Sequence, residues 1–476
     1  MARAPQVYDA VVVGAGPNGL TAAARLANAG RRVLVVEAAP TIGGGSRTKS
    51  LGGARYDVCA AVHPFGASSP AFEELQLDRH GLRWLHPPIA LAHPFEDGHA
   101  AMIERRADAG PPAPPGRDDR RWRAAVGIFA DDWEHLRHVV LAPVPRSLVD
   151  HPVRMARFGL VAGQPMSVLA RVFKGRDAAA LLTGLAAHGG ARLSLPTTAG
   201  VGVALAAATE AVGMPVAAGG SQSIVDALAS VIRLAGGEIE TDRRISSRAD
   251  LPRSRALLLD LTPTQAASVL GGPGPRWRYG VAACKLDLVL SGPMPWSAQR
   301  CREAGTVHLG GEWREVAGAE RKTAAGRVVD RPFVIVAQPC VSDPARAPQG
   351  QHVVWAYRHV PNGCDEVAAV AGIERRFDQF APGWRDLVLH RKVTTATDYE
   401  AYNANYVGGD IASGAMSPWQ TIARPRLALD PYRLGRDDAW LCSQSTAPGP
   451  GVHGMCGWHA AGSVLHARRG AWSQRP

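Results

Sequence analysis

The pattern of apolar and polar positions near the N-terminus predicts a strand, a turn, a helix and a second strand over residues 7–37. Val11–Val13 and Val33–Val36 are short, continuous apolar runs, which are typical of strands buried on both faces of a parallel sheet. Gly30 follows a segment in which small apolar residues recur at helical spacing. That helix face consists of Leu20, Ala23, Ala24 and Ala27.

A second α/β segment is expected at residues 214–245. Ser221 stands where it can cap a helix whose apolar face recurs every three or four residues, and Gly236–Gly237 end that helix. A strand through Ile239 and Ile245 follows, and the apolar run 256–262 predicts another. The chain therefore returns to strand and helix alternation after a long excursion.

The C-terminal stretch 446–465 predicts a helix that begins where a cluster of glycines stops. Met455, Trp458, Ala461 and Leu465 recur at spacings of three and four. Glycines before a helix allow its first N–H groups to approach a ligand closely, and the positive end of the helix favours negative charge. We expect this helix start, with Gly449, Gly451 and Gly454 before it, to face a bound cofactor.

Composition and charge narrow the class of protein. The 476 residues are 46% hydrophobic and 20% charged, as in an ordinary folded protein large enough for two lobes. The net charge of +11 favours an anionic cofactor or a membrane surface, and no basic stripe interleaved with aromatic residues indicates nucleic acid. No segment has the roughly 20 apolar residues of a membrane span, so membrane contact is expected to be peripheral.

The seven cysteines predict neither disulfides nor a metal site. Their number is odd and no Cys-x-x-Cys pair occurs among them. This usage fits a reducing compartment, and we expect a cytoplasmic protein without bound metal.

The first glycine motif predicts a dinucleotide site. Gly14, Gly16 and Gly19 fill the G-x-G-x-x-G positions between the first strand and helix, and Glu37 ends the second strand, where an acid can bind an adenosine ribose. NAD and FAD both use this unit. The second glycine cluster, TIGGGSRT at residues 41–48, favours FAD, because it allows further backbone contact with a long cofactor, and Arg47 can bind its phosphates.

Together these motifs resemble the phytoene desaturase-related FAD-dependent oxidoreductases, closest to the branch typified by pyridine nucleotide-disulfide oxidoreductase domain-containing protein 2. Further stretches carry the resemblance; they are DVCAAVHPFGASSP (57–70), HGLRWLHPPIALAHPFEDG (80–98), YGVAACKLDLVLSGPMPW (279–296), PFVIVAQPCVSDPARAP (332–348), HVVWAYRHVPNG (352–363), NANYVGGDIASG (403–414) and PGPGVHGMCGWHAA (448–461). The resemblance implies FAD, oxidation of largely apolar molecules, and an α/β fold with a split Rossmann-type FAD-binding domain, amine oxidase/phytoene desaturase-like, and a mixed α+β substrate lobe formed by two insertions.

The predicted division assigns three pieces to the FAD-binding domain, at 1–75, 214–285 and 430–476, and two pieces to the substrate lobe, at 76–213 and 286–429. The proline-rich and charged stretch 106–123 is expected to be exposed, irregular chain. The predicted cofactor-binding residues are Gly14, Gly16, Pro17, Asn18, Gly19, Glu37, Ala38, Gly44, Gly45, Arg47, Thr48, Ile245, Ser445, Gly451, Val452, His453, Gly454 and Met455.

One departure from the family pattern bears on the function. In amine oxidases an acid that follows a glycine binds the ribityl chain just before the last motif, whereas this chain has Ser443, Gln444 and Ser445 there. Neutral residues at this place are similar to the desaturase branch. The resemblance therefore points away from amine oxidation.

The leading hypothesis is dehydrogenation of an apolar molecule, with hydride passing to the flavin and a proton to a base or solvent. Because no second G-x-G-x-x-G follows position 50, oxygen or a quinone is expected to reoxidise the flavin. His63 and His453 are the candidate catalytic bases, and Tyr402 and Asn403 are candidates for the substrate pocket. A redox-neutral isomerase, an amine oxidase and a non-enzymatic FAD-binding interaction protein remain alternatives, and the sequence does not state the oligomeric state.

Overall fold

A parallel five-stranded sheet forms the first lobe, and distant parts of the chain contribute to it. The structure is a computed structural model that describes residues 7–104, 118–435 and 438–467. The strand order is β16-β10-β1-β2-β9. The strands are β1 (Tyr8–Val13), β2 (Val33–Val36), β9 (Glu238–Glu240), β10 (Ser254–Leu259) and β16 (Ala439–Leu441). This sheet and its helices are the predicted split Rossmann-type domain.

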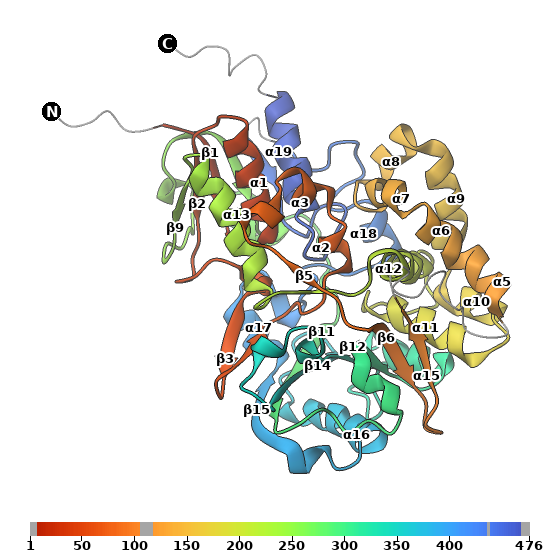
Figure 1. Cartoon of the computed structure of the whole chain (residues 1–476). Coiled ribbons are helices and arrows are strands. Elements are labelled where there is room, and N and C mark those ends of the chain that lie inside the picture. The colour runs from red at the N-terminus through yellow and green to blue at the C-terminus, as the bar shows by residue number, and fades with distance from the viewer. Residues whose placement is uncertain (1–6, 105–117, 436–437, 468–476) are drawn as a thin grey trace.

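Both faces of this sheet are buried, which explains the continuous apolar runs of its strands. Ala10 and Val12 of β1 face the helices on one side, and Val11 and Val13 face the other side, with α14 (Pro263–Leu270). The helices on the first side are α1 (Pro17–Asn28), α13 (Gln222–Leu234) and α19 (Met455–Ala467). Figure 1 shows α1 between α13 and α19, so the C-terminal helix lies beside the first helix of the chain.

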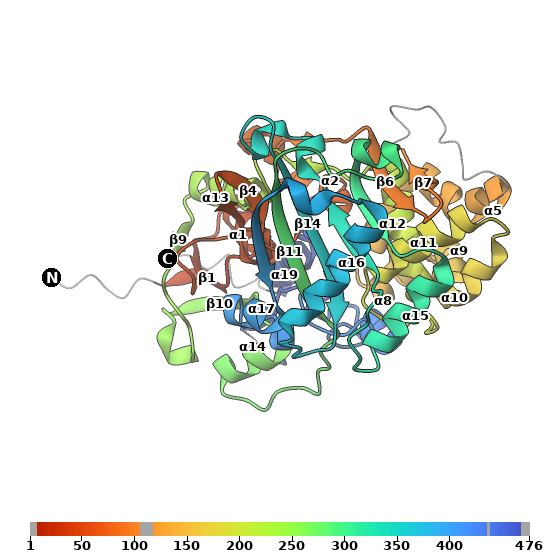
Figure 2. The same cartoon turned by 90° about the horizontal axis from the view of Figure 1, so that it is seen from below.

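A mixed seven-stranded sheet forms the floor of the second lobe, with the order β15-β11-β14-β13-β12-β6-β7. All neighbouring strands are antiparallel except β12 and β6. The strands are β6 (Ile89–Pro94), β7 (Ala100–Ile103), β11 (Ala282–Leu290), β12 (Ala304–Leu309), β13 (Val334–Ala337), β14 (His352–Val360) and β15 (Val388–Thr394). One face packs on α16 (Val370–Phe380), while α15 (Trp313–Thr323) lies near the other face (Figure 2).

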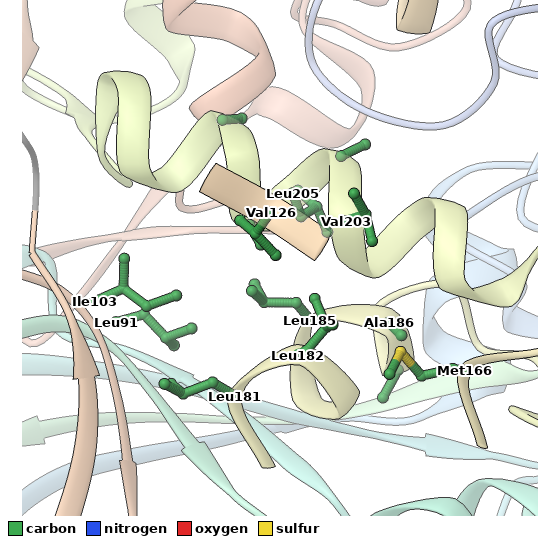
Figure 3. Close-up of a cluster of buried hydrophobic side chains, with 14 of the residues drawn as sticks. Leu91, Ile103, Val126, Met166, Leu181, Leu182, Leu185, Ala186, Val203 and Leu205 are labelled. Atoms are coloured by element: carbon green, nitrogen blue, oxygen red, sulfur yellow. The ribbon is translucent and has the colours of Figure 1, made fainter. Parts of the chain in front are cut away.

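Helices cover the other face of this sheet. They are α5 (Asp119–Trp122), α6 (Ile128–Asp131), α7 (Trp133–Val140), α8 (Val144–Asp150), α9 (Pro152–Ala162), α10 (Met166–Leu169), α11 (Arg176–Ala187) and α12 (Thr198–Val212). Figure 3 shows Leu91 and Ile103 of the sheet gathered with Leu181 and Leu185 of α11 in one buried cluster. The Ala/Gly-rich α12 is buried along most of its length because it packs on α11 and α9, and α11 in turn packs on β6 and β7 of the sheet.

Short elements connect the two lobes. They are β3 (Thr48–Leu51), β4 (Ala54–Asp57), α2 (Pro64–Ala67), α3 (Pro70–Glu74), β5 (Trp84–Leu85), β8 (Val216–Ala217), α17 (Ala396–Tyr402) and α18 (Pro418–Ile422). β5 pairs with β8, so the chain leaves the first lobe and returns to it along neighbouring paths.

Several details differ from the sequence-based expectations. Ser221 stands at the start of α13 but makes no capping hydrogen bond with its side chain, and Ile245 lies outside β9. The stretch 106–123 falls mostly outside the described residues, and its last part forms α5 instead of irregular chain. The predicted boundary between 285 and 286 lies inside β11, because one long strand of the second sheet begins at Ala282.

Candidate functional site: a dinucleotide cradle that opens into an apolar cavity

One cavity of about 730 Å³ runs from the carboxyl ends of β1, β2 and β10 to the helices of the second lobe. This edge of a parallel sheet is where such folds bind their ligands. The predicted site residues that line the cavity are Gly14, Gly16, Pro17, Asn18, Glu37, Ala38, Gly44, Gly45, Arg47, His63, Ile245, Tyr402, Asn403, Gly451, Val452 and His453.

The first glycine turn has the geometry of a phosphate cradle. Gly14 adopts a φ of +100°, which L side chains rarely adopt, and a Cβ on Gly19 would lie 2.2 Å from the Gly14 carbonyl oxygen. The backbone at Gly19 therefore packs directly against the backbone at Gly14, and the start of α1 lies at the cavity. Beside it, the buried Asn18 Oδ1 has no hydrogen-bond partner among the described residues, as expected of an acceptor that a bound group would satisfy.

Glu37 is held in place by backbone donors. Its Oε2 accepts a hydrogen bond from the Ala15 N–H at 2.8 Å, and its Oε1 accepts one from the Ala39 N–H at 2.9 Å. An ionised carboxylate has about four acceptor sites, so these bonds orient the group without saturating it. The carboxylate can still accept from hydroxyl donors of a ligand in the cavity.

The second glycine turn packs directly on the first. The Gly43 N–H donates to the Ala15 carbonyl at 2.8 Å, and a Cβ on Gly44 would lie 3.3 Å from the Gly16 Cα. The two turns thus form one continuous wall of backbone, on which a long dinucleotide fits.

Arg47 was expected to contact phosphates, but its guanidinium binds the protein. It donates to the Thr41 carbonyl at 2.5 Å, to the Tyr402 hydroxyl at 3.0 Å and to Glu37 Oε1 at 3.3 Å. Tyr402 in turn donates to the Gly44 carbonyl at 2.6 Å. Arg47 and Tyr402 therefore fix the second glycine turn, and Tyr402 stands beside the cradle instead of at the substrate end.

His453 caps the C-terminal helix. Its Nδ1 accepts a hydrogen bond from the Met455 N–H at 3.1 Å, at the first residue of α19. Burial lowers the pKa of His453 to about 4, and a hydrogen bond to the Gly449 backbone opposes that shift. Because both bonds engage the ring, the geometry favours a role in holding the start of α19 over a role as catalytic base.

His63 has a defined tautomer. Its Nε2 lies 2.8 Å from Ser221 Oγ, and that hydroxyl donates its own proton to the Ala60 carbonyl at 2.6 Å. The His63 Nε2 must therefore carry the proton and donate it, so Nδ1 carries a lone pair. Burial lowers the pKa of His63 to about 4, and the imidazole is neutral at pH 7.

Five predicted cofactor residues do not line the cavity. Gly19 instead permits close backbone packing, and Gly454 leaves room for a neighbouring side chain, because a Cβ on Gly454 would lie 2.3 Å from Thr21 Oγ1. Thr48 donates to Asp57 Oδ1 at 2.6 Å, and Ser445 donates to the Ser413 carbonyl at 2.7 Å. Met455 is buried in the helix layer of the first lobe. These residues support the walls of the site.

Three polar residues lie at the carboxyl ends of the strands; sequence reasoning missed Asp260, and it named Ser443 and Gln444 only as a departure from the family pattern. Asp260 follows β10 directly, and Ser443 and Gln444 follow β16; all three line the cavity. The available signal was their position, because residues just after parallel strands meet at the ligand-binding edge. Asp260 stood in the apolar run 256–262 without an assigned role.

Asp260 lies against the first glycine turn. Its Oδ2 accepts a hydrogen bond from the Gly19 N–H at 3.0 Å, beside the start of α1. Burial raises the pKa of this carboxyl from 3.8 to about 7, and the nearby Glu37 raises it further, while hydrogen bonds from Gly19 and Gly16 oppose the shift. Its protonation can therefore change near neutral pH, next to the place where α1 favours a phosphate.

We expect dinucleotide binding to weaken as the pH rises above 7, by up to about tenfold for each pH unit. An ionised Asp260 would repel the phosphates, so binding should favour the protonated carboxyl. Asp260→Asn keeps the acceptor for Gly19 and should flatten this dependence. Fluorescence titration with FAD from pH 6 to pH 9 measures it, and an identical slope in both proteins would contradict this role of Asp260.

Asp260 should also affect the stability of the folded protein, independently of dinucleotide binding. The folded protein holds the Asp260 proton more tightly than an unfolded chain with a pKa of 3.8. The free energy of unfolding should therefore fall as the pH rises from about 4 to about 7, and Asp260→Asn should remove that part of the slope. Urea unfolding without cofactor separates this effect from binding.

Among the residues that the structure describes, none at the far end of the cavity carries a formal charge. The charged lining residues are all near the cradle; they are Glu37, Arg47, Arg243, Arg244 and Asp260. Apolar residues line the far end, among them Met155, Phe158, Val201, Leu205 and Ile335.

The polar groups at the far end include His188 and Tyr357. His188 Nε2 lies 3.0 Å from His308 Nε2, and burial lowers the pKa of His188 to about 3, so it is neutral. Tyr357 lines the same cavity on β14. This end can therefore accommodate a neutral, mostly apolar molecule with few hydrogen-bonding groups.

Comparisons with known proteins agree with this architecture. The family described as NAD(P)-binding Rossmann-like domain matches residues 12–88. The chain is 27% identical to pyridine nucleotide-disulfide oxidoreductase domain-containing protein 2 of Rattus norvegicus, over 96% of this chain and 93% of that protein. The resemblance recognised from the sequence motifs is thus confirmed along nearly the whole chain.

Solved structures share the fold. An oxidoreductase from Methanosarcina mazei superposes with a TM-score of 0.62 at 17% identity, covering 96% of this chain and 99% of the other. Cyclohexylamine oxidase from Brevibacterium oxydans gives a TM-score of 0.60 at 13% identity, covering 98% and 100%. The predicted amine oxidase-like α/β fold with a split Rossmann-type domain is confirmed.

Proposed function

We propose that this chain is an FAD-dependent dehydrogenase that desaturates a neutral, largely apolar small molecule. The single observation that carries the proposal is the continuity of the cavity, which joins a dinucleotide cradle to an uncharged, mostly apolar end. FAD, when bound, supplies a two-electron acceptor that can take up a hydride and pass the electrons to oxygen or a quinone.

The protein's own groups orient the reactants and exclude water. The cradle residues Gly14, Gly16 and Gly44 offer backbone, and Glu37 offers a fixed acceptor for hydroxyl groups. The start of α19, fixed by His453, presents its positive end at the cavity and favours negative charge there. The apolar side chains of the far end keep the substrate dry.

His63 is proposed to orient the substrate through the Nδ1 lone pair. With its pKa lowered to about 4, this imidazole holds a proton weakly at neutral pH. The released proton is therefore expected to pass to solvent without resting on His63.

The test is an anaerobic titration of the purified protein with bound FAD. Neutral apolar molecules that carry a saturated bond next to an oxygen function should bleach the flavin absorption, and the product should be lighter by two hydrogens. Primary amines should leave the spectrum unchanged, since no carboxylate of the described chain lines the far end to bind an ammonium group. Bleaching by amines with release of peroxide, or a product of unchanged mass, would contradict the proposal.

A further inference from the structure

A row of aromatic and polar side chains crosses the second sheet under the far end of the cavity. Ile335 of β13 lies directly opposite Tyr357 of β14 and directly opposite His308 of β12. Directly opposite residues point to the same face of a sheet. His93 of β6 is the next member, since its ring centre lies 6.4 Å from that of His308. This row brings a phenol and two imidazoles to the face that the helices cover.

His188 stands between this row and the cavity. It directly follows α11, its Nε2 lies 3.0 Å from His308 Nε2, and the two ring centres are 5.0 Å apart. His188, Ile335 and Tyr357 line the cavity, whereas His308 does not. The cavity therefore meets a polar side chain on each side of Ile335.

The Tyr357 hydroxyl is a donor without an acceptor on the described part of the protein. It makes no hydrogen bond within 7–104, 118–435 or 438–467, although the residue is only 8% exposed. Burial raises the pKa of Tyr357 above its ordinary value of 10, and the nearby Cys59 and Glu320 raise it further. The phenol therefore keeps its proton at neutral pH, and an unpartnered buried hydroxyl on a cavity indicates a ligand that accepts from it.

A histidine chain of His188, His308 and His93 supplies a second donor. All three rings are neutral, because burial lowers the pKa of His188 to about 3, that of His93 to about 4 and that of His308 well below 6.5. His93 Nε2 donates to the Gly311 carbonyl at 2.7 Å, so its Nδ1 carries a lone pair.

The other end of the histidine chain follows from the buried nitrogens. Like His93 Nδ1, His308 Nδ1 is buried without a hydrogen-bond partner among the described residues. A buried N–H without an acceptor is rarer than a lone pair without a donor, which favours a proton on His308 Nε2. That proton is donated to His188 Nε2, so the His188 proton is on Nδ1, where it can be donated to a ligand.

These two donors match a carbonyl oxygen, which has two lone pairs and no proton of its own. A hydrocarbon would leave both donors unsatisfied, and an alcohol would add a third donor. A carboxylate would bring a negative charge to an end of the cavity where none of the described residues is positively charged. The remaining lining is mostly apolar, so the rest of the molecule should be apolar as well.

We propose that Tyr357 and His188 bind the carbonyl oxygen of a neutral, otherwise apolar molecule. This oxygen site follows from the row and the histidine chain; only the claim that the bound carbonyl compound is the molecule to be desaturated rests on the proposed function. In that reaction the two donors would favour loss of a proton to solvent from the carbon next to the carbonyl group, because the electron pair of the broken C–H bond spreads onto the hydrogen-bonded oxygen.

The probe for the oxygen site is adamantanone, titrated calorimetrically into the full protein with FAD bound. The carbons that flank its carbonyl group are bridgeheads, so the molecule can be neither enolised nor desaturated, and only binding is measured. Methyleneadamantane, which has the same shape but no oxygen, is titrated in parallel. The ratio of the ketone affinity to the hydrocarbon affinity reports the hydrogen bonds to the oxygen, because the apolar contacts of the two molecules are alike.

Tyr357→Phe should lower this affinity ratio by about tenfold, because it removes one donor from the oxygen. Tyr8→Phe is the control, since it removes a hydroxyl that donates to Glu238 Oε2 at 3.0 Å in the first lobe, and it should leave the ratio unchanged. Infrared spectra give a second readout. The C=O band of bound adamantanone should lie below its position in hexane, because hydrogen bonds weaken the C=O bond, and it should move back in Tyr357→Phe.

His188→Leu should lower the ratio by a similar factor. His188→Asn, whose amide N–H lies close to the place of the imidazole Nδ1–H, should keep part of it. A packing defect at this position would instead weaken the ketone and the hydrocarbon alike. The flavin spectrum and thermal unfolding show whether each variant is folded.

An unshifted C=O band in wild type, or a ratio that Tyr357→Phe or His188→Leu leaves unchanged, would overturn the oxygen site. The two proposals can fail separately. If the ratios change as expected while no carbonyl compound bleaches the flavin, the oxygen site stands and the proposed function fails. If an apolar molecule without a carbonyl group bleaches the flavin while both variants keep the ratio of wild type, the proposed function stands and the oxygen site fails.

Discussion

Replacing Gly457 by alanine is expected to destabilise the protein by about 3 kcal/mol and to reduce its FAD content strongly. A Cβ at this position would lie 1.8 Å from the Asn18 carbonyl oxygen and 2.7 Å from the Asn18 carbonyl carbon. Both atoms belong to the backbone of α1, so no side-chain rotation can relieve the contact. Helix α19 would have to move away from α1, and it carries with it the residues 451–453 that line the cavity.

A matched substitution separates this contact from the general effect of removing a glycine. Gly318 lies in α15, and a Cβ there would meet nothing within 4 Å. Gly318→Ala should be neutral or stabilise by up to about 1 kcal/mol, through helix propensity alone. Urea unfolding and the flavin-to-protein absorbance ratio measure both variants. Equal stability of Gly457→Ala and wild type would show that the two helices do not require this approach.

The sequence predicted the cradle because its chemistry is local. Gly14, Gly16 and Glu37 are close in sequence, and the strands and helix around them follow from periodicity. The C-terminal helix start was also predicted, since glycine spacing and helical spacing meet at Met455. These features depend on backbone geometry, which neighbouring residues determine.

The roles of the polar side chains could not be predicted in the same way, because their partners are distant in sequence. Arg47 was assigned to phosphates, but it binds Tyr402, 355 positions away. Ser221 was assigned to a helix cap, but its hydroxyl binds Ala60 and His63, about 160 positions away. Residue type indicated a polar contact in each case, and only the fold decides which acceptor is nearest.

The uncharged end of the cavity was equally inaccessible from sequence. His188 is followed by two glycines and carries no motif, and Tyr357 is one of several aromatic residues in a strand. They share the cavity because α11 ends opposite β14, and that juxtaposition depends on how the helical layer packs on the second sheet.

Replacing Lys285 by methionine is expected to cost about 3–5 kcal/mol of the free energy of unfolding, because it leaves a buried charge without its partner. Lys285 is fully buried on β11, and its Nζ lies 2.8 Å from Asp287 Oδ1. The ammonium also donates to the carbonyl oxygens of Asp57 at 2.6 Å and Val58 at 3.1 Å. One cation thus joins the second sheet to the segment that follows the glycine turns.

The loss of stability in Lys285→Met should grow with pH. This dependence distinguishes a buried carboxylate without its partner from a simple packing defect. Burial already raises the pKa of Asp287 to about 6, and Lys285 opposes that shift. Without Lys285 the folded protein should hold the Asp287 proton still more tightly, so the variant should be least destabilised near pH 5 and most destabilised near pH 8. Urea unfolding at several pH values measures this dependence.

Lys285→Met combined with Asp287→Leu should recover most of the stability, since a buried ion pair replaced by apolar groups is often nearly neutral. The Val58 carbonyl would still accept from the Tyr399 hydroxyl at 3.1 Å, while the Asp57 carbonyl would lose a donor, at a cost of about 1 kcal/mol. Lys322→Met, an exposed lysine of α15, is the control and should change stability by less than about 0.5 kcal/mol. If the double variant is no more stable than Lys285→Met, the ammonium acts mainly on the two carbonyl groups, and the link between the lobes does not depend on the ion pair.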